Sequence, residues 1–368
     1  MKTCMVVLMM TVLQLVSYAQ EGGKTAPLRV GIAGLTHGHV QGILRAASEG
    51  VVEIAGIAEP NRDLAERLMK QYKIAPSLWY ADLNQMLEKT KPEAVTAFGS
   101  IYDHLAVVRA CAPKKIHVMV EKPLAVSLDH ARQMASLARQ NGIHLLTNYE
   151  TTWYGSNHRA FTMLHDEKKF GDIIKMVVHD GHQGPQEIGV NPEFLEWLTD
   201  PRMNGGGALM DFGCYGANLI TWLMKGERPL SVFAVTQQIK PEIYPKVDDE
   251  ATIVVTYPKA QAIIQASWNW PYSRKDMEIY GKTGYIAADR EGIRYMTQPA
   301  DGERTEKIPA RAAPYNDPFL FFSAVVRNKI QVADTDLSSL SLNMTAMEIL
   351  DAARQSSTTG RVVLLEKN

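Results

Sequence analysis

Residues 28–40 read LRVGIAGLTHGHV, and this stretch decides the fold of the first half of the chain. The apolar run 28–33 predicts a short strand, and GILRAAS at 42–48 predicts the beginning of a helix. A strand, a tight glycine turn and a helix N-terminus are the parts of a dinucleotide-binding loop, whose backbone N–H groups face the pyrophosphate. The stretch therefore predicts a phosphate loop.

The loop departs from the glycine-rich pattern at two positions. Gly34 ends the strand and Gly38 lies in the turn, but Thr36 and His39 occupy the second and third glycine positions. A metal-binding pair of His37 and His39 would need a third ligand, and side chains at i and i+2 on a turn usually point apart. We therefore predict no metal. Capping of the helix by the histidines is compatible with nucleotide binding, since imidazole can also bond phosphate.

The second predicted strand ends in an acidic residue. In dinucleotide-binding folds such a residue, about 20 positions after the loop, holds the ribose hydroxyls. Glu59 ends the run VVEIAGIAE at this place. It favours NAD over NADP, although Arg62 nearby would tolerate a 2′-phosphate.

The pattern along the chain changes near residue 150. Residues 27–149 alternate short β-branched runs with amphipathic segments, which predicts a Rossmann-type, doubly wound parallel sheet. Residues 150–340 contain longer successive strand-like runs, which predict an α+β domain with a mostly antiparallel open sheet. Residues 341–368 are expected to form a helix and a strand that pack back on the body. The fold class is therefore α/β followed by α+β.

The charge and the cysteine content argue against a nucleic-acid partner and against a disulfide framework. The formal net charge is −1 and no dense Lys/Arg cluster appears, so we expect no nucleic-acid partner. Beyond the first twenty residues, the cysteines Cys111 and Cys214 are too few and too far apart to indicate a disulfide framework.

The N-terminus differs from the rest of the chain. Lys2, an apolar stretch from Cys4 to Val16 and small residues before Gln20 are typical of a secretory signal peptide, residues 1–19, cut after Ala19. The apolar stretch is too short for a membrane span, so we expect an exported, periplasmic protein without stable membrane insertion.

Several motifs together identify a family resemblance. They are GIAGL at 31–35, Glu59-Pro60-Asn61 after the second strand, Glu121-Lys122-Pro123 after the strand IHVMV, and GGGALMDFGCYGAN at 205–218. In this order they resemble the Gfo/Idh/MocA family, named for glucose–fructose oxidoreductase and inositol dehydrogenase. The resemblance covers about residues 27–365.

The resemblance implies roles for four residues. Lys122 matches the lysine that touches the substrate hydroxyl and the nicotinamide ribose, and Asp211 matches the acidic residue of the substrate domain. Tyr215 stands where many members have histidine, as in glucose–fructose oxidoreductase and the dihydrodiol dehydrogenases. Asn218 replaces an aspartate that is common in the histidine form, and these departures point to one branch of the family.

The spacing of these residues agrees with that chemistry. Asp211, Tyr215 and Asn218 would share one face of a single helix over residues 208–225, behind three glycines. A tyrosine with an ordinary pKa of about 10 is a poor base at neutral pH, but the ammonium of Lys122 would lower that pKa. Asp211 would orient a substrate hydroxyl or keep Lys122 charged.

Two further groups of candidates follow. The expected cofactor-binding residues are Gly34, Thr36, His37, Gly38, His39, Glu59, Ser100, His104, Glu121 and Lys122. The expected sugar-pocket residues are His182, Asn218 and Trp153, with His179 and Trp268-Asn269-Trp270 as further possibilities. Tryptophan in a strand is more often a core residue than a ligand contact.

The predicted function is that of an NAD(P)-dependent oxidoreductase acting on CH–OH groups of sugars or polyols, with Lys122 and Tyr215 handling the hydroxyl proton. Free cofactor is not expected outside the cytosol, so an exported enzyme should hold NAD tightly and recycle it.

Two alternatives remain open. The first is an NAD-dependent glycoside hydrolase or lyase that works through a transient keto-sugar, although its Tyr-Pro-Thr-His-Gly type motif is not found. The second is a non-catalytic sugar or nucleotide sensor that kept the fold. A homo-oligomer is expected through the second sheet, because QAIIQASWNW at 261–270 is apolar on both faces.

Overall fold

The computed structural model describes residues 26–365, so the expected signal peptide lies outside the described residues. The first domain contains a six-stranded sheet in the order β3-β2-β1-β4-β5-β6, and all its strand pairs are parallel. The strands are β1 (Leu28–Ala33), β2 (Val52–Ala58), β3 (Trp79–Tyr80), β4 (Ala94–Ala97), β5 (His117–Glu121) and β6 (Leu145–Asn148). The order reverses between β1 and β4, which creates a crevice at the carboxyl ends of the strands. The predicted doubly wound sheet is confirmed.

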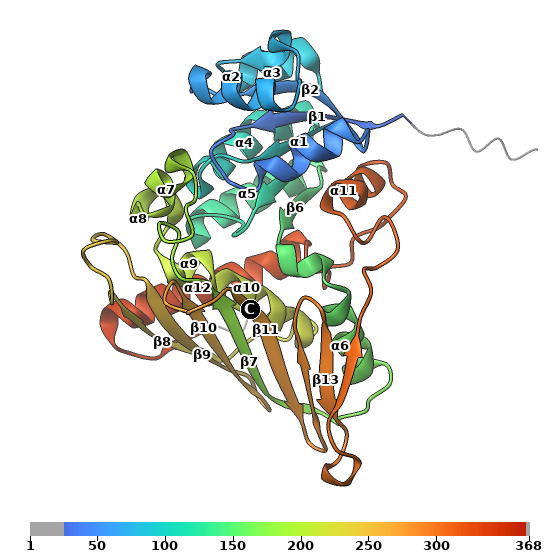
Figure 1. Cartoon of the computed structure of the whole chain (residues 1–368), viewed down its shortest axis with the longest axis vertical. Coiled ribbons are helices and arrows are strands. Elements are labelled where there is room, and N and C mark those ends of the chain that lie inside the picture. Colours follow the sequence, from blue (N-terminus) through green and yellow to red (C-terminus); the bar gives the residue numbers. More distant parts are fainter. Residues whose placement is uncertain (1–25, 366–368) are drawn as a thin grey trace, which may run out of the picture.

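Helices connect these strands (Figure 1). They are α1 (Val40–Ser48), α2 (Arg62–Gln71), α3 (Leu83–Thr90), α4 (His104–Cys111) and α5 (Leu128–Asn141), with the 3₁₀ turns η1 (Pro76–Leu78), η2 (Ile101–Asp103) and η3 (Ala112–Lys114). Three of these helices have side-chain N-caps: Asn61, Asp82 and Ser127 accept a backbone N–H from the first turn of α2, α3 and α5, respectively.

The second sheet has nine strands in the order β14-β13-β12-β11-β7-β10-β9-β8-β15. Its strands are β7 (Ile173–Gly181), β8 (Ser231–Gln237), β9 (Glu250–Thr256), β10 (Gln261–Ser267), β11 (Arg274–Gly281), β12 (Tyr285–Ala288), β13 (Gly292–Met296), β14 (Arg304–Lys307) and β15 (Val363–Leu364). Only β7 and β10 pair in parallel, because the chain passes through helices and two strands before it returns beside β7. The predicted, mostly antiparallel sheet is thus confirmed, and the one parallel pair makes it a mixed sheet.

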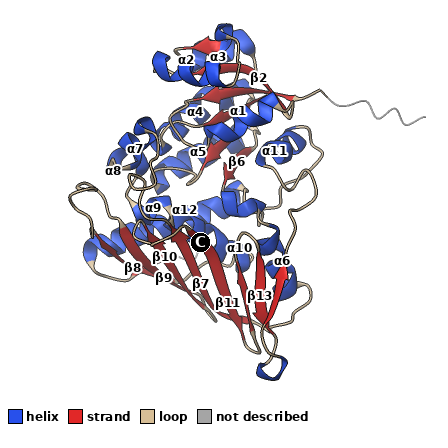
Figure 2. Cartoon of the chain, in the orientation of Figure 1, coloured by secondary structure: helices blue, strands red, loops and turns tan. Residues whose placement is uncertain are grey.

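Figure 2 shows the helices α9, α10 and α12 between the two sheets. The helices of this part are α6 (Gly155–His165), α7 (Pro192–Leu198), α8 (Pro201–Asn204), α9 (Ala208–Asp211), α10 (Gly213–Leu223), α11 (Pro318–Val326) and α12 (Leu340–Thr359), with η4 (Glu150–Trp153) and η5 (Pro299–Asp301). Along β9, residues alternate between fully buried and partly exposed. One face of the second sheet therefore packs against helices and the other remains open.

The structure corrects the expectation of one helix over residues 208–225. The helix is interrupted at Phe212, so that Asp211 ends α9 and Gly213 begins α10. At the break the N–H of Tyr215 donates to the carbonyl of Phe212 instead of that of Asp211. The freed Asp211 carbonyl accepts from the Lys122 Nζ atom at 3.1 Å. The interruption therefore serves the site described below.

Helix α11 is the second departure from the sequence prediction. It lies within the range expected for the second domain, but Phe319, Phe321 and Phe322 pack into the core of the first domain around β1 and α1. Figure 1 shows α11 beside α1 and β6. Helix α12 then returns to the second domain, where it packs against α10 and β8.

Two further observations concern the described residues 26–365. Cys111 and Cys214 are buried free thiols. Within that range the structure contains no helix that is both long enough and apolar enough to cross a bilayer.

Two helical glycines differ in the space beside them, and they generate a test of the fold. A Cβ atom at Gly216 in α10 would lie 2.3 Å from Cγ2 of Ile264, whereas one at Gly42 in α1 would meet Phe319 at an ordinary 3.6 Å. Overpacking costs about 1–3 kcal/mol. We expect Gly216→Ala to lower the free energy of unfolding by roughly that amount.

The matched control is Gly42→Ala, which should be neutral or stabilise by up to about 1 kcal/mol through helix propensity. Thermal and denaturant unfolding of the two variants would check the pair. Equal stabilities would contradict the packing of α10 on β10.

Candidate functional site

A cavity of about 300 Å³ lies where the phosphate loop, the end of β5 and the second domain meet. Among the residues around it are His37, Gly38, His39, Lys122, His182, Phe194, Asp211, Phe212, Tyr215 and Lys275. The structure therefore brings three of the expected loop residues, at positions 37–39, together with the expected catalytic residues.

The loop is shaped by Gly34 and Glu59. Gly34 has a φ of +80°, and a Cβ atom there would lie only 2.6 Å from the backbone nitrogen of Gly99. The Glu59 carboxylate accepts the N–H groups of Leu35 at 2.7 Å and Asn61 at 2.8 Å. The side chain is buried, and burial raises its pKa. Glu59 thus braces the loop, and a ribose contact would have to use its remaining lone pairs.

His37 is buried and neutral, because burial holds its pKa well below the ordinary value. Its Nδ1 atom accepts the backbone N–H of His39 at 3.1 Å, so the ring proton lies on Nε2. Among the described residues, that Nε2–H group has no hydrogen-bond partner. A buried donor without a partner is costly, and the site therefore favours an acceptor oxygen at this point.

His39 and Glu121 complete a cluster with His37. Their candidate ligand atoms all lie within 4.8 Å of one another. The argument that a third ligand is missing and that the two rings point apart is therefore wrong. The cluster nevertheless does not present two free histidine lone pairs, because the His37 Nδ1 lone pair is used and its Nε2 atom is protonated. The Nδ1 atom of His39 is already bonded to Glu121 at 2.9 Å.

Glu121 ends β5 and holds the loop against the sheet. Its carboxylate also accepts from Nδ2 of Asn148 at 2.7 Å. Burial opposes its ionisation, but the contact with His39 outweighs burial and lowers its pKa.

Lys122 and Asp211 form a buried ion pair between the two domains. The Lys122 Nζ atom lies 2.5 Å from Oδ1 of Asp211, and Nε1 of Trp268 donates to Oδ2 at 3.0 Å. Burial disfavours both charges, but their mutual attraction raises the pKa of Lys122 and lowers that of Asp211. The site therefore holds an ammonium beside a carboxylate, and Asp211 fixes the position of Lys122. Trp268 is a core residue that orients Asp211.

Tyr215 lies between two ammonium groups. The Nζ atoms of Lys122 and Lys275 are 5.2 Å and 4.8 Å from its ring centroid. The expectation that an ammonium lowers the pKa of Tyr215 is nevertheless wrong. Burial, reinforced by the charge of Glu150, raises that pKa well above its ordinary value. Tyr215 is thus a neutral O–H group in the free protein.

The sequence did not single out Lys275 or Glu150. Lys275 lies on β11, its Nζ atom pairs with the Glu150 carboxylate, and the contact lowers the pKa of Glu150 to about 2 against the effect of burial. The signal was present: Lys275 lies two and four positions before the buried Met277 and Ile279, so it shares their face of the strand.

Several expected residues do not line this cavity. The Ser100 hydroxyl bonds Asp103 at 2.6 Å in a capping box. His104 is fully buried, bonds the Leu124 carbonyl at 3.1 Å, and has its pKa lowered to about 4 by burial. Both side chains are buried and bond to neighbouring protein groups.

Two of the three expected sugar-pocket residues also lie elsewhere. Asn218 is fully buried and donates to the Leu337 carbonyl at 2.9 Å, on the side of α10 that faces α12. Trp153 bonds Asn148 and packs on Phe321 of α11. His182 does line the cavity, and burial lowers its pKa to about 4, so its ring is neutral.

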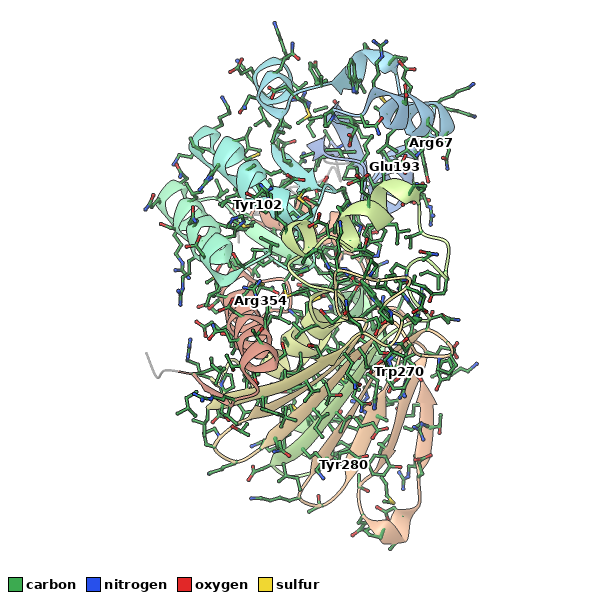
Figure 3. The ribbon with its side chains drawn as sticks, turned by 90° about the vertical axis from the view of Figure 1, so that its left-hand side faces the viewer. Arg67, Tyr102, Glu193, Trp270, Tyr280 and Arg354 are labelled. Carbon is green, nitrogen blue, oxygen red and sulfur yellow. The ribbon has the colours of Figure 1, made fainter. Side chains whose placement is uncertain are left out.

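Helix α7 covers the phosphate loop, which the sequence did not predict. Trp197 Nε1 donates to the Thr36 hydroxyl at 3.0 Å, and the Phe194 ring lies 4.6 Å from that of His37. Figure 3 shows Glu193 of α7 beside Arg67 of α2, and their side chains form an ion pair at 2.7 Å. Thr36 is therefore bound by the second domain instead of being open to a ligand.

Comparisons with known proteins agree with this arrangement. Residues 28–149 match the model described as an oxidoreductase family with an NAD-binding Rossmann fold, and residues 158–287 match the GFO/IDH/MocA C-terminal domain. A relative named trans-1,2-dihydrobenzene-1,2-diol dehydrogenase, from Sus scrofa, is 23% identical over 63% of this chain. The match spans 65% of that relative's length.

Two solved structures share the fold. An aldose–aldose oxidoreductase from Caulobacter crescentus, complexed with glycerol, has a TM-score of 0.77 and is 19% identical. The match covers 92% of this chain and 100% of that structure's chain. An oxidoreductase from Agrobacterium radiobacter, in complex with NAD+, L-tartaric acid and magnesium, has a TM-score of 0.75 and is 17% identical. That match covers 91% of this chain and 98% of the other chain. The chain belongs to the Gfo/Idh/MocA family of oxidoreductases, with an NAD-binding Rossmann domain followed by the C-terminal domain of that family.

Proposed function

We propose that the protein is an NAD-dependent oxidoreductase that transfers hydride between a carbinol carbon of a sugar or related polyol and a tightly bound nicotinamide. One observation carries the proposal. The cavity that contains Gly38 and His39 of the phosphate loop also contains Lys122, Asp211 and Tyr215. A dinucleotide at the loop would then lie next to ionisable groups that can exchange a proton with a substrate hydroxyl.

The residues present fit a dinucleotide. The N-terminus of α1 and the unpartnered Nε2–H of His37 offer donors to phosphate oxygens. Arg62 is engaged elsewhere, since it pairs with Glu66 and lies over the Trp79 ring at 5.3 Å. We therefore favour NAD over NADP. When bound, the nicotinamide supplies the hydride donor or acceptor.

Lys122 and Tyr215 would handle the proton of the reacting oxygen. Both are protonated at neutral pH, because their pKa values are raised. They are thus ready to donate a proton to a carbonyl oxygen that receives hydride, whereas oxidation of an alcohol requires one of them to lose its proton first. Asp211 would keep the Lys122 ammonium in place during either direction.

The first experiment is to purify the mature protein without added cofactor, denature it, and identify released nucleotide by mass spectrometry. We expect a stoichiometric amount of NAD, because α7 covers the loop to which the cofactor would bind. The purified protein should then change the redox state of this NAD when sugars and polyols are added.

The same samples separate the alternatives. Cleavage of a glycoside with no net redox change would favour the glycoside hydrolase or lyase. If NAD is bound but no carbinol changes its redox state, in wild type and in Lys122→Met alike, the result would favour a sensor. Protein that neither retains nor binds NAD would contradict the proposal.

The raised pKa values predict a pH dependence with a definite sign. The proton-accepting form of Lys122 or Tyr215 is scarce at neutral pH, so kcat/KM for alcohol oxidation should rise by up to about tenfold per pH unit into the alkaline range. For carbonyl reduction kcat/KM should stay level at neutral pH and fall only at high pH.

Steady-state rates in both directions would check this, with Tyr215→Phe and Lys122→Met as comparisons. The rise of kcat/KM for alcohol oxidation with pH should disappear in the variant that lacks the titrating group. An oxidation rate that is highest at acidic pH would contradict the assignment.

We further propose that the protein is exported after cleavage at Ala19, and that copies associate through the open face of the second sheet. On that face Val235 of β8 is 51% exposed, and Ile263 of β10 is partly exposed. Fractionation with N-terminal sequencing should give a periplasmic chain that begins at Gln20, and light scattering should give more than one chain per particle. A monomer, or an uncleaved cytosolic chain, would contradict these points.

A further inference from the structure

A second, larger cavity opens beyond the candidate site. It has a volume of about 670 Å³, and His182, Phe212 and Lys275 line both this outer cavity and the inner one of about 300 Å³. The two cavities therefore adjoin at these three side chains. A ligand larger than the inner cavity would extend past Lys275 toward the outer one.

The outer cavity lies at one end of the second sheet. Its walls come from β11, from residues 272–273 before β11, and from the turn at 289–291 between β12 and β13. Glu150, which begins η4, and Tyr154, which directly precedes α6, also line it. Figure 3 shows Trp270, which precedes these residues, at this end of the sheet.

The charges in the outer cavity are nearly balanced, with five basic and six acidic residues. Its basic residues are Arg274, Lys275, Arg290, Arg294 and Lys307, and its acidic residues are Glu150, Asp276, Glu278, Asp289, Glu291 and Glu306. Many of them pair with each other, as Arg274 does with Asp276 at 2.8 Å and Lys275 does with Glu150. A cavity for an anion would show an excess of free cations instead. Mixed donors and acceptors fit a neutral ligand that carries many hydroxyl groups.

An aromatic side chain also lines the outer cavity. Tyr272 is 58% exposed, which is unusual for a large side chain that has no role in packing. Its ring offers a flat apolar face on which the apolar face of a sugar ring can stack, and its O–H group can bond a sugar hydroxyl. Tyr272 lines the outer cavity and not the inner one, whereas Lys275 lines both.

We propose that the substrate is a glycoside or oligosaccharide. The sugar unit that is oxidised or reduced lies in the inner cavity, and the next unit lies in the outer cavity against Tyr272. Lys275 and Glu150 stand between the two units and would bond hydroxyl groups near the linkage. This inference rests on the proposed oxidoreductase function and assigns the class of its substrate.

The test compares substrates and variants of the purified full-length mature protein. Wild type, Ser273→Trp and Tyr272→Ala are assayed for NAD reduction with neutral hexoses and with α- and β-linked disaccharides and trisaccharides of them. Ser273 is exposed and lines the outer cavity, so a tryptophan there would fill it. Tyr315→Ala is the matched control, because Tyr315 is a partly exposed tyrosine that lines neither cavity.

We expect wild type to prefer at least one glycoside over its free sugar. The ratio of kcat/KM for that glycoside to kcat/KM for the free sugar should fall at least about tenfold in Ser273→Trp and by less in Tyr272→Ala. It should keep its wild-type value in Tyr315→Ala. A ratio that the two cavity variants leave unchanged would overturn the proposal.

Direct binding keeps this result distinct from failure of the proposed function. Saturation-transfer NMR with the same saccharides measures binding whether or not turnover occurs. Binding of glycosides that Ser273→Trp abolishes would support the outer cavity even if no oxidation were detected. Turnover of free sugars with no binding or turnover of any glycoside would overturn the glycoside assignment and leave the oxidoreductase standing.

Discussion

The buried ion pair of Lys122 and Asp211 is the interaction on which the site depends. Two opposite charges in a protein interior are tolerated only when each is bonded on several sides. Here the Asp211 side chain also accepts from Trp268, and the Asp211 carbonyl also accepts from Lys122. The interruption of the helix at Phe212 makes the second contact available. The pair thus ties the end of β5 to the end of α9, across the two domains.

Sequence reasoning predicted the parts whose role depends on local pattern. The strand and turn at residues 28–40 follow from one short motif. The parallel sheet of the first domain follows from the alternation of strands and helices, because parallel strands need crossover connections. These features need no knowledge of distant contacts, whereas the meeting of Lys122 with Asp211, 89 positions apart, was expected from the family resemblance.

The errors arise where distant parts of the chain decide the outcome. Helical spacing placed Asn218 on the same face as Tyr215. Because α10 is buried on all sides, Asn218 instead packs against α12, where its side chain donates to Asn343. The pKa of Tyr215 depends on its burial and on Glu150, which comes from another element. Helix α7 is seven residues long, and no local pattern indicates that it packs on the phosphate loop. Such contacts become visible only in the folded chain.

The path of α11 has a consequence for domain motion. The chain leaves the first domain after β6, returns to it at α11 and leaves it again before α12. The domains are therefore joined by several covalent connections instead of one linker. Rotation about a single flexible residue is not available, and any opening of the crevice must bend all of these connections together. Cleavage of the segment at 309–317 by a protease would still leave the two domains covalently attached through the connection after β6.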